Sequence, residues 1–97
     1  MEREKVVFRV WKDNGGVIAL FPRISDSIDG YMCQSYEDVG QHGGVNPGVV
    51  ISRTRLARPA EYRDLARELR DLGYKLRIMS RCTYADFEER KKQYAKH

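Results

Sequence analysis

The sequence predicts an α+β fold: a small, mostly antiparallel sheet of about four to five strands, with one main helix packed on it and a C-terminal helix. Three observations predict this class. Short segments alternate between apolar and polar residues, glycine-containing turns join some of them, and one later segment has the spacing of an amphipathic helix. We expect residues 1–97 to form a single domain in the order β-β-β-(β)-α-β-α, with the residues from about 92 onward frayed.

The first two strands are predicted to form a hairpin. In the run VVFRVW, residues 6–11, Val6 and every second residue after it would lie on one face, with Arg9 and Trp11 on the other. Asn14 and Gly15 supply the positive φ angles of a tight turn. The run VIALF, residues 17–21, is apolar on both faces, which predicts a central strand.

The next part of the chain predicts shorter extended segments. Residues 23–30 are mostly polar and predict a loop, and YMCQSY, residues 31–36, predicts a third strand. After a glycine-rich stretch, VVIS at residues 49–52 predicts a short extended segment.

The clearest predicted element is a helix that begins near Pro59 and ends just before Gly73. Arg58, just before it, is a poor N-cap because its side chain offers no acceptor. The apolar stripe that predicts the helix consists of Tyr62, Leu65, Ala66, Leu69 and Leu72.

The C-terminal part predicts one more strand and a second helix. Residues 74–81 alternate, with Leu76 and Ile78 on one face. Thr83 and Asp86 have the spacing of a capping box, so a helix should run from about residue 84 toward residue 96.

Composition narrows the class of function. A chain of 97 residues has little room for a deep cleft, which disfavours a small-molecule enzyme. There is no signal peptide and no apolar run long enough to span a bilayer, so we expect a cytoplasmic protein without a membrane partner, with Cys33 and Cys82 reduced. The net charge of +4 favours contact with nucleic acid or an acidic protein.

The glycine-rich stretch GQHGG, residues 40–44, has two interpretations: a binding loop, or a hairpin connection whose glycines serve backbone conformation. It lacks the lysine and hydroxyl of a phosphate-binding loop, and it is not a dinucleotide fingerprint. In the functional interpretation, Gln41 and His42 are presented at the tip of a loop.

Catalytic and metal sites are disfavoured. Cys33, His42 and Asp38 could act as nucleophile, base and orienting group, but no local feature marks an activated thiol. A zinc site from both cysteines, His42 and His97 would lack the usual ligand spacing. We therefore expect no catalytic residues, no metal and no cofactor.

A basic sheet face is the better candidate for a binding site. If the strands that carry them share a face, the cations and the indole would form one surface, made of Arg9, Trp11, Lys75, Arg77 and Arg81. It could bind phosphates while the ring stacks on a base, or it could receive an acidic protein surface. The remaining possibility is an ordinary solvated face, with Trp11 packed under the C-terminal helix.

Four segments in order carry a resemblance to a known family. VVFRVWKDNGGVIALFP, GYMCQSY, VGQHGG and PAEYRDLARELRDLGYKLRIMSR resemble a family of small uncharacterised bacterial proteins associated with mobile elements: plasmids, conjugative transposons and prophages. Arg58 departs from the hydroxyl residue typical of that family before the helix-opening proline. The resemblance implies an accessory factor, with inhibition of a host defence system as one such role, and no active residue to carry over.

We therefore expect a non-enzymatic protein that binds another protein. The alternative is a weak, salt-sensitive nucleic-acid-binding module, and the third class is a small thiol or metal-dependent enzyme. A homodimer through an uncovered sheet face also remains open, with Val7, Trp11 and Met79 in the contact.

Overall fold

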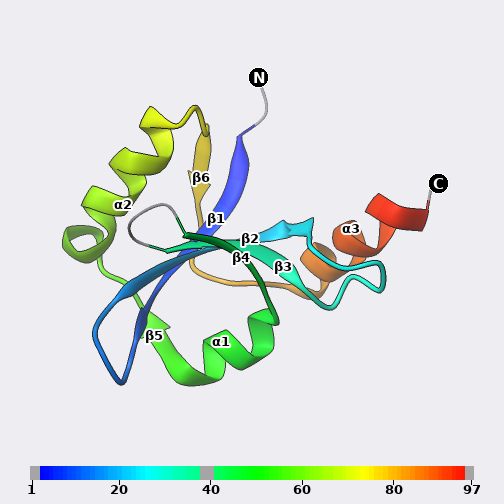
Figure 1. Cartoon of the computed structure of the whole chain (residues 1–97), viewed down its shortest axis with the longest axis horizontal. Helices are drawn as coiled ribbons and strands as arrows, with labels where there is room; N and C mark the ends of the chain where they lie inside the picture. Colours follow the sequence, from blue (N-terminus) through cyan, green and yellow to red (C-terminus); the bar gives the residue numbers. More distant parts are fainter. Residues whose placement is uncertain (1–2, 38–40, 96–97) are drawn as a thin grey trace.

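The computed structural model describes residues 3–37 and 41–95, and it confirms the α+β class (Figure 1). In these residues six strands form one sheet in the order β4-β3-β2-β1-β5, and β6 also pairs with β1. Every strand pair is antiparallel except β1 with β6. The strands are β1 (Glu4–Trp11), β2 (Val17–Ser25), β3 (Cys33–Glu37), β4 (Gln41–Val45), β5 (Thr54–Leu56) and β6 (Leu76–Ile78), and the helices are α1 (Pro47–Arg53), α2 (Pro59–Asp71) and α3 (Tyr84–Ala95).

The hairpin of β1 and β2 follows the predicted alternation. Phe8 lies opposite Ala19 on one face of the sheet, and Val7 lies opposite Leu20 on the other. Gly15 adopts a φ of 74° in the turn, where the main-chain N–H of residue 11 donates to the carbonyl oxygen of residue 16 at 2.8 Å. Both faces of this hairpin are buried, so a separate structural element must pack against each face.

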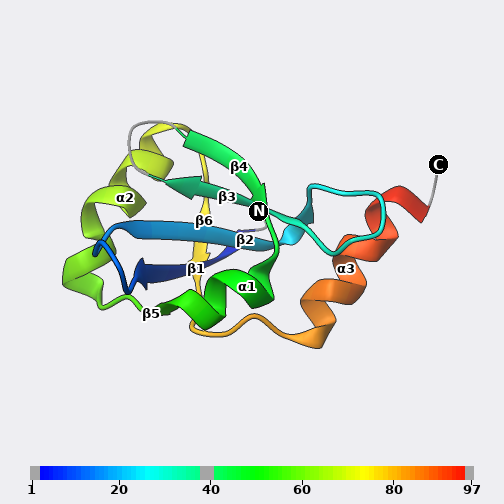
Figure 2. The same ribbon diagram turned by 60° about the horizontal axis from the view of Figure 1, so that its bottom comes forward.

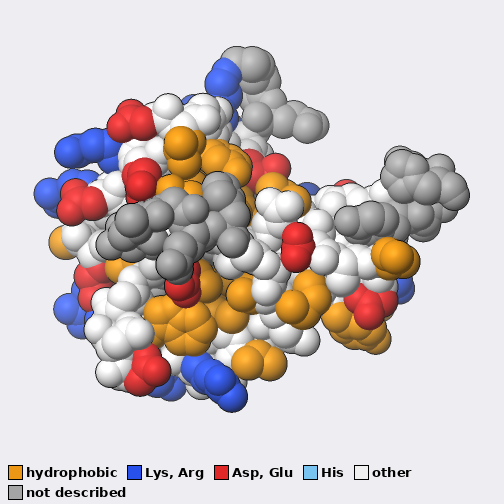
Figure 3. All heavy atoms as spheres, viewed as in Figure 1, with side chains coloured by type: hydrophobic (Ala, Val, Ile, Leu, Met, Phe, Trp, Pro, Cys, Tyr) orange, Lys and Arg blue, Asp and Glu red, His pale blue; other side chains and the backbone are white. Residues whose placement is uncertain are grey.

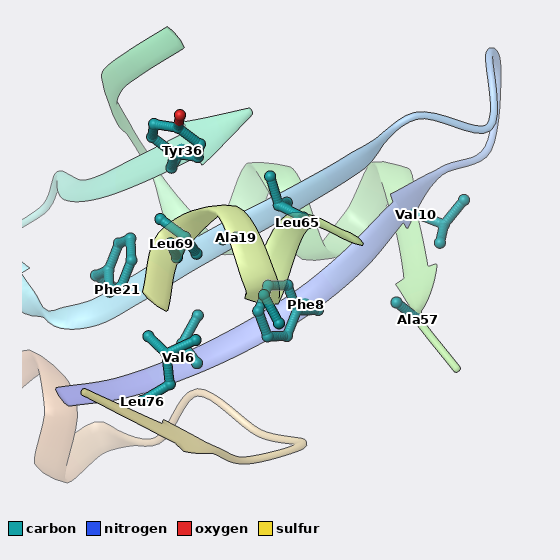
Figure 4. Packing of buried hydrophobic residues seen from close by; sticks show 11 residues of the cluster. Val6, Phe8, Val10, Ala19, Phe21, Tyr36, Ala57, Leu65, Leu69 and Leu76 are labelled. Atoms are coloured by element: carbon teal, nitrogen blue, oxygen red, sulfur yellow. The ribbon is translucent and has the colours of Figure 1, made fainter. Parts of the chain in front are cut away.

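Helix α2 covers one face of the sheet and forms the larger core with it (Figure 4). Leu65, Ala66 and Leu69 of the predicted stripe are buried, whereas Leu72 is 57% exposed because the helix ends at residue 71. Gly73 follows with a φ of 105°, as expected for a residue just past a helix end. The buried residues of this core are Val6, Phe8, Val10, Ala19, Phe21, Tyr36, Ala57, Leu65, Ala66, Leu69 and Leu76.

The start of α2 shows how the poor cap at Arg58 is compensated. Arg58 makes no side-chain capping bond; instead its main-chain N–H donates to the Glu61 carboxylate at 2.8 Å. The Arg55 guanidinium also donates to that carboxylate, at 2.8 Å. The hydrogen bond from Arg55, followed by the one from Arg58, lowers the pKa of Glu61 to about 2.

Helix α1 covers the opposite face and corrects the prediction of an extended segment at residues 49–52 (Figure 2). The Asn46 side chain accepts from the main-chain N–H groups of Gly48 and Val49, at 2.9 and 3.3 Å, and Pro47 occupies the first turn. Val50 then packs into a second core, and capping and packing outweigh the β-propensity of the run VVIS. That core contains Val7, Ile18, Leu20, Cys33 and Val50.

Three other boundaries differ from the predictions. The stretch predicted as a glycine-rich loop contains β4, an edge strand of the sheet. Strand β2 continues to Ser25 through a register shift, into the segment predicted as a loop. The last strand spans three residues instead of eight, because β6 pairs only with the first residues of β1.

Helix α3 begins with the predicted capping box and lies at the end of the sheet opposite α2 (Figures 1 and 2). The main-chain N–H of Thr83 donates to the Asp86 carboxylate at 2.8 Å, and the N–H of Asp86 donates to the Thr83 hydroxyl at 3.3 Å. The buried Arg90 guanidinium donates to the carbonyl oxygens of Pro22 and Gly30. These bonds fix α3 to β2 and to the segment between β2 and β3.

Substitution of Gly30 by alanine is expected to destabilise this contact. Gly30 has a φ of 79°, and an added Cβ would lie 3.2 Å from the main-chain nitrogen of Lys91. Left-handed backbone strain and the clash with α3 together should lower the free energy of unfolding by about 2 kcal/mol. Gly15 is the matched control, since it has a φ of 74° with nothing within 4 Å. Urea denaturation that finds Gly30→Ala no more harmful than Gly15→Ala would contradict this prediction.

Candidate functional site

A charged groove lies at the end of the sheet where β1 begins. It has a volume of about 1010 Å³, and its walls come from four parts of the chain: the start of β1, the late part of β2, the segment leading into β6, and α3. The lining residues are Arg3, Glu4, Lys5, Arg23, Gly73, Tyr74, Lys75, Arg77, Glu89 and Gln93. Five of these side chains are basic and two are acidic, so the groove has an excess of positive charge.

A buried carboxylate organises the floor of this groove. Asp86 is 0% exposed and accepts from Lys5 Nζ at 2.7 Å and from Arg23 Nε at 2.8 Å. Burial alone would raise the pKa of Asp86, but hydrogen bonds from Lys5, Arg23 and the Thr83 N–H outweigh burial and lower it. Asp86 therefore stays ionised at neutral pH and holds two of the cations in fixed positions.

The two cations of this floor differ in their access to solvent. The Lys5 side chain is 6% exposed, so its ammonium interacts mainly with Asp86 and little with solvent. The Arg23 side chain is 39% exposed and contacts Asp86 through Nε, which leaves the outer part of its guanidinium at the groove wall. With Arg3 and Arg77, both exposed, Arg23 presents donors suited to a bidentate carboxylate or a phosphate.

The predicted basic face is divided by the fold. Lys75 and Arg77 line the groove. Arg9 shares the sheet face of Arg77, but Arg77 lies opposite Lys5, about 13 Å along β1 from Arg9. Arg81 is exposed in the connection between β6 and α3 and does not line the groove.

Arg9 and Trp11 serve structural contacts. Arg9 donates to the Thr54 hydroxyl at 2.9 Å and to the carbonyl oxygens of Thr54 and Ile51 at 2.9 and 3.3 Å, which satisfies acceptors at the end of α1. Trp11 Nε1 donates to Glu37 at 2.8 Å, and the indole packs on the core beneath α1 rather than under the C-terminal helix. Val7 is also buried in that core, so it is covered by α1 and cannot meet a second copy.

Gln41 and His42 lie in β4, on the sheet edge farthest from β6. Residues 38–40, including Asp38, and the side chains of Gln41 and His42 lie outside the described part of the structure, as does His97. Burial raises the pKa of Cys33 to about 12, and it also raises that of Cys82, so both thiols are protonated at neutral pH. Within the described residues, no group of three or more His, Cys, Asp and Glu could hold a metal ion.

A second groove, which is apolar, lies between β5 and β6. Its volume is about 320 Å³, and it is lined by Phe8, Leu56, Ala57, Pro59, Tyr62, Ile78, Met79 and Ser80. The Phe8 and Tyr62 rings stack with their centroids 4.6 Å apart. Leu56 and Met79 are 44% and 43% exposed, which is a large exposure for such side chains.

Sequence reasoning missed Lys5, Arg23 and Asp86 as site residues. Lys5 precedes the predicted first strand, Arg23 falls in the predicted loop, and Asp86 was assigned only a capping role. Residues 3–5 are all charged, so the sequence has no alternation that would extend the first strand to Glu4 and place Lys5 on the sheet.

Comparisons with family models, with curated proteins and with solved structures find no match to this chain. Among the described helices, none combines the length and the apolar character that crossing a bilayer requires. A function for this protein is therefore proposed from the geometry of the two grooves.

Proposed function

We propose that this protein is a non-enzymatic binding protein whose charged groove receives a carboxylate-bearing segment of another protein. The observation that carries the proposal is the groove of about 1010 Å³, in which the buried Asp86 fixes Lys5 and Arg23 among five basic side chains. Preorganised cations reduce the ordering cost of binding an anion, and arginine pairs well with carboxylates.

The lining favours a protein over a nucleic acid. Glu4 and Glu89 lie among the cations and would repel a continuous row of phosphates, whereas a protein segment can place its own donors beside them. Single-stranded nucleic acid also needs aromatic rings for base stacking. Tyr74 is the aromatic residue lining the groove, and its ring already stacks on Phe21 at 5.1 Å between centroids.

The cellular role that we propose comes from the sequence resemblance. It is that of an accessory factor of a mobile element, acting in the cytoplasm by contact with a host protein. The specific role that we propose is inhibition of a host defence system, because such inhibition requires a binding surface and no catalytic residue.

Reversal of the charge of Arg77 should weaken binding of an acidic probe about tenfold, because it removes an exposed guanidinium from the groove wall. The probe is a fluorescein-labelled hexaglutamate peptide, followed by fluorescence anisotropy at low and moderate salt. The matched control is Arg67→Glu on α2, which makes the same charge change where basic and acidic side chains are interspersed (Figure 3). It should weaken binding at most about twofold at moderate salt.

The outcomes separate the three classes of function. Equal losses for Arg77→Glu and Arg67→Glu would show binding by net charge alone and would remove the groove as the site. The nucleic-acid-binding module would be favoured instead if a single-stranded oligonucleotide bound more tightly than the peptide and if Arg77→Glu abolished oligonucleotide binding. Bound metal in the purified protein, or fast reaction of Cys33 with a thiol probe, would favour the enzyme class.

A further inference from the structure

The outer edge of β6 is unpaired among the strands that the structure describes. Strand β6 pairs with β1 alone, in parallel. The carbonyl oxygen of Lys75 accepts from the N–H of Glu4 at 2.6 Å, and the N–H of Met79 donates to the carbonyl of Val6 at 2.9 Å. Because successive residues of a strand direct their main-chain groups to opposite sides, those of Leu76 and Ile78 point away from β1.

Strand β6 contributes one side chain to each groove, from opposite faces of the sheet. Arg77 lies opposite Lys5 and lines the charged groove, whereas Ile78 lies opposite Val6 and lines the apolar groove. A strand added to the edge of β6 would direct alternate side chains to these two faces. One set would approach the basic side chains, and the other set would approach the apolar groove.

The apolar groove can accept a side chain from such a strand. Its floor is the stacked pair Phe8 and Tyr62, and its walls include the half-exposed Leu56 and Met79. Large apolar side chains that are nearly half exposed and gathered in one groove are typical of an interaction surface.

We propose that β6 binds an extended segment of the partner as an added strand, in which acidic and large apolar side chains alternate. The acidic side chains occupy the charged groove, and an apolar side chain occupies the groove between β5 and β6. Strand addition supplies main-chain hydrogen bonds for affinity, and the two grooves supply the side-chain preference. This inference rests on the proposed function, because it uses the charged groove as the acidic half of the site.

The experiment compares two labelled peptides of about seven residues and identical composition. In one, glutamate and leucine alternate; in the other, the glutamates form one block and the leucines another. Fluorescence anisotropy should show that the alternating peptide binds about tenfold more tightly. N-methylation of one alternate set of its peptide nitrogens should abolish this gain, whereas N-methylation of the other set should leave it.

Protein variants test whether the apolar groove is responsible for the tighter binding of the alternating peptide. The double variant Leu56→Ser, Met79→Ser should lose the preference for the alternating peptide while it still binds the hexaglutamate probe. Leu72→Ser is the control, since Leu72 is 57% exposed outside the groove, and it should keep the preference. Thermal unfolding of each variant checks that the fold is kept.

Equal affinity for the two peptides, or equal effects of the two N-methylation patterns, would overturn strand addition while leaving the charged groove in place. Failure of every acidic peptide to bind would overturn the proposed function and this inference with it. A dimer of the chain in sedimentation that the alternating peptide dissociates would place a second copy on the edge of β6, and would likewise overturn the proposal.

Discussion

Replacement of Asp86 by asparagine is expected to lower the free energy of unfolding by about 3–5 kcal/mol at neutral pH. Asp86 is fully buried and neutralises Lys5, whose ammonium lies 2.7 Å away in a position 5% exposed to solvent. The asparagine keeps the shape but not the charge, so the Lys5 ammonium would remain buried without its counter-ion. The loss is measured by urea denaturation monitored by circular dichroism.

The control for this prediction removes both charges. In the double variant Lys5→Met, Asp86→Leu no buried charge is left without a partner, and stability should recover to within about 1–2 kcal/mol of the native protein. Arg23 can turn to water in that variant because its side chain is 39% exposed. A double variant as unstable as Asp86→Asn would show that the carboxylate acts through its capping bonds rather than through Lys5.

The pH dependence provides a second measurement of the same contact. The folded pKa of Asp86 lies below its ordinary value, so its stabilising effect is complete above the unfolded pKa of about 4 and is lost as the pH falls through the folded pKa. The difference in unfolding free energy between the native protein and Asp86→Asn should therefore narrow below about pH 4. If the difference in unfolding free energy stayed constant below about pH 4, the negative charge of Asp86 would not be the source of the stabilisation.

Replacement of Arg90 by leucine should cost about 3 kcal/mol, since its buried guanidinium donates to the carbonyl oxygens of Pro22 and Gly30. Without these donors, both carbonyls are left unsatisfied beneath α3. The amides of α3 should then lose hydrogen-exchange protection before those of β1 and β2. Lys92→Leu is the control, because the Lys92 side chain is 63% exposed on the same helix. Uniform loss of protection across the chain would contradict a local role for Arg90.

Local sequence patterns were sufficient to predict the hairpin, α2 and the start of α3. In each case the pattern and the tertiary environment favour the same structure: Gly15 provides the turn, Leu65 and Leu69 fill the core, and Thr83 caps α3. Helix α1 could not be predicted from the apolar run VVIS, because β-branched residues also suit a strand. The local signal was Asn46 followed by Pro47, a cap and a first-turn proline.

The candidate site was predictable only in part. Lys75 and Arg77 were identified from strand alternation, and they do line the charged groove. The pairing of Lys5 with Asp86 joins residues 81 positions apart, and no spacing rule connects them. Arg9, like Arg77, is an arginine in an alternating strand, yet its guanidinium donates to Thr54 at the end of α1. Such a difference depends on tertiary contacts, which a single sequence does not encode as a local pattern.

The sharing of one edge of β1 by β5 and β6 has a consequence for biosynthesis. β1 is synthesised before its edge partners β5 and β6, and Asp86, the counter-ion of Lys5, follows Lys5 by 81 positions. Contacts between residues so distant in the chain slow folding and delay its completion. The nascent hairpin should therefore stay only partly structured until the segment that contains Asp86 has been synthesised and has left the ribosome.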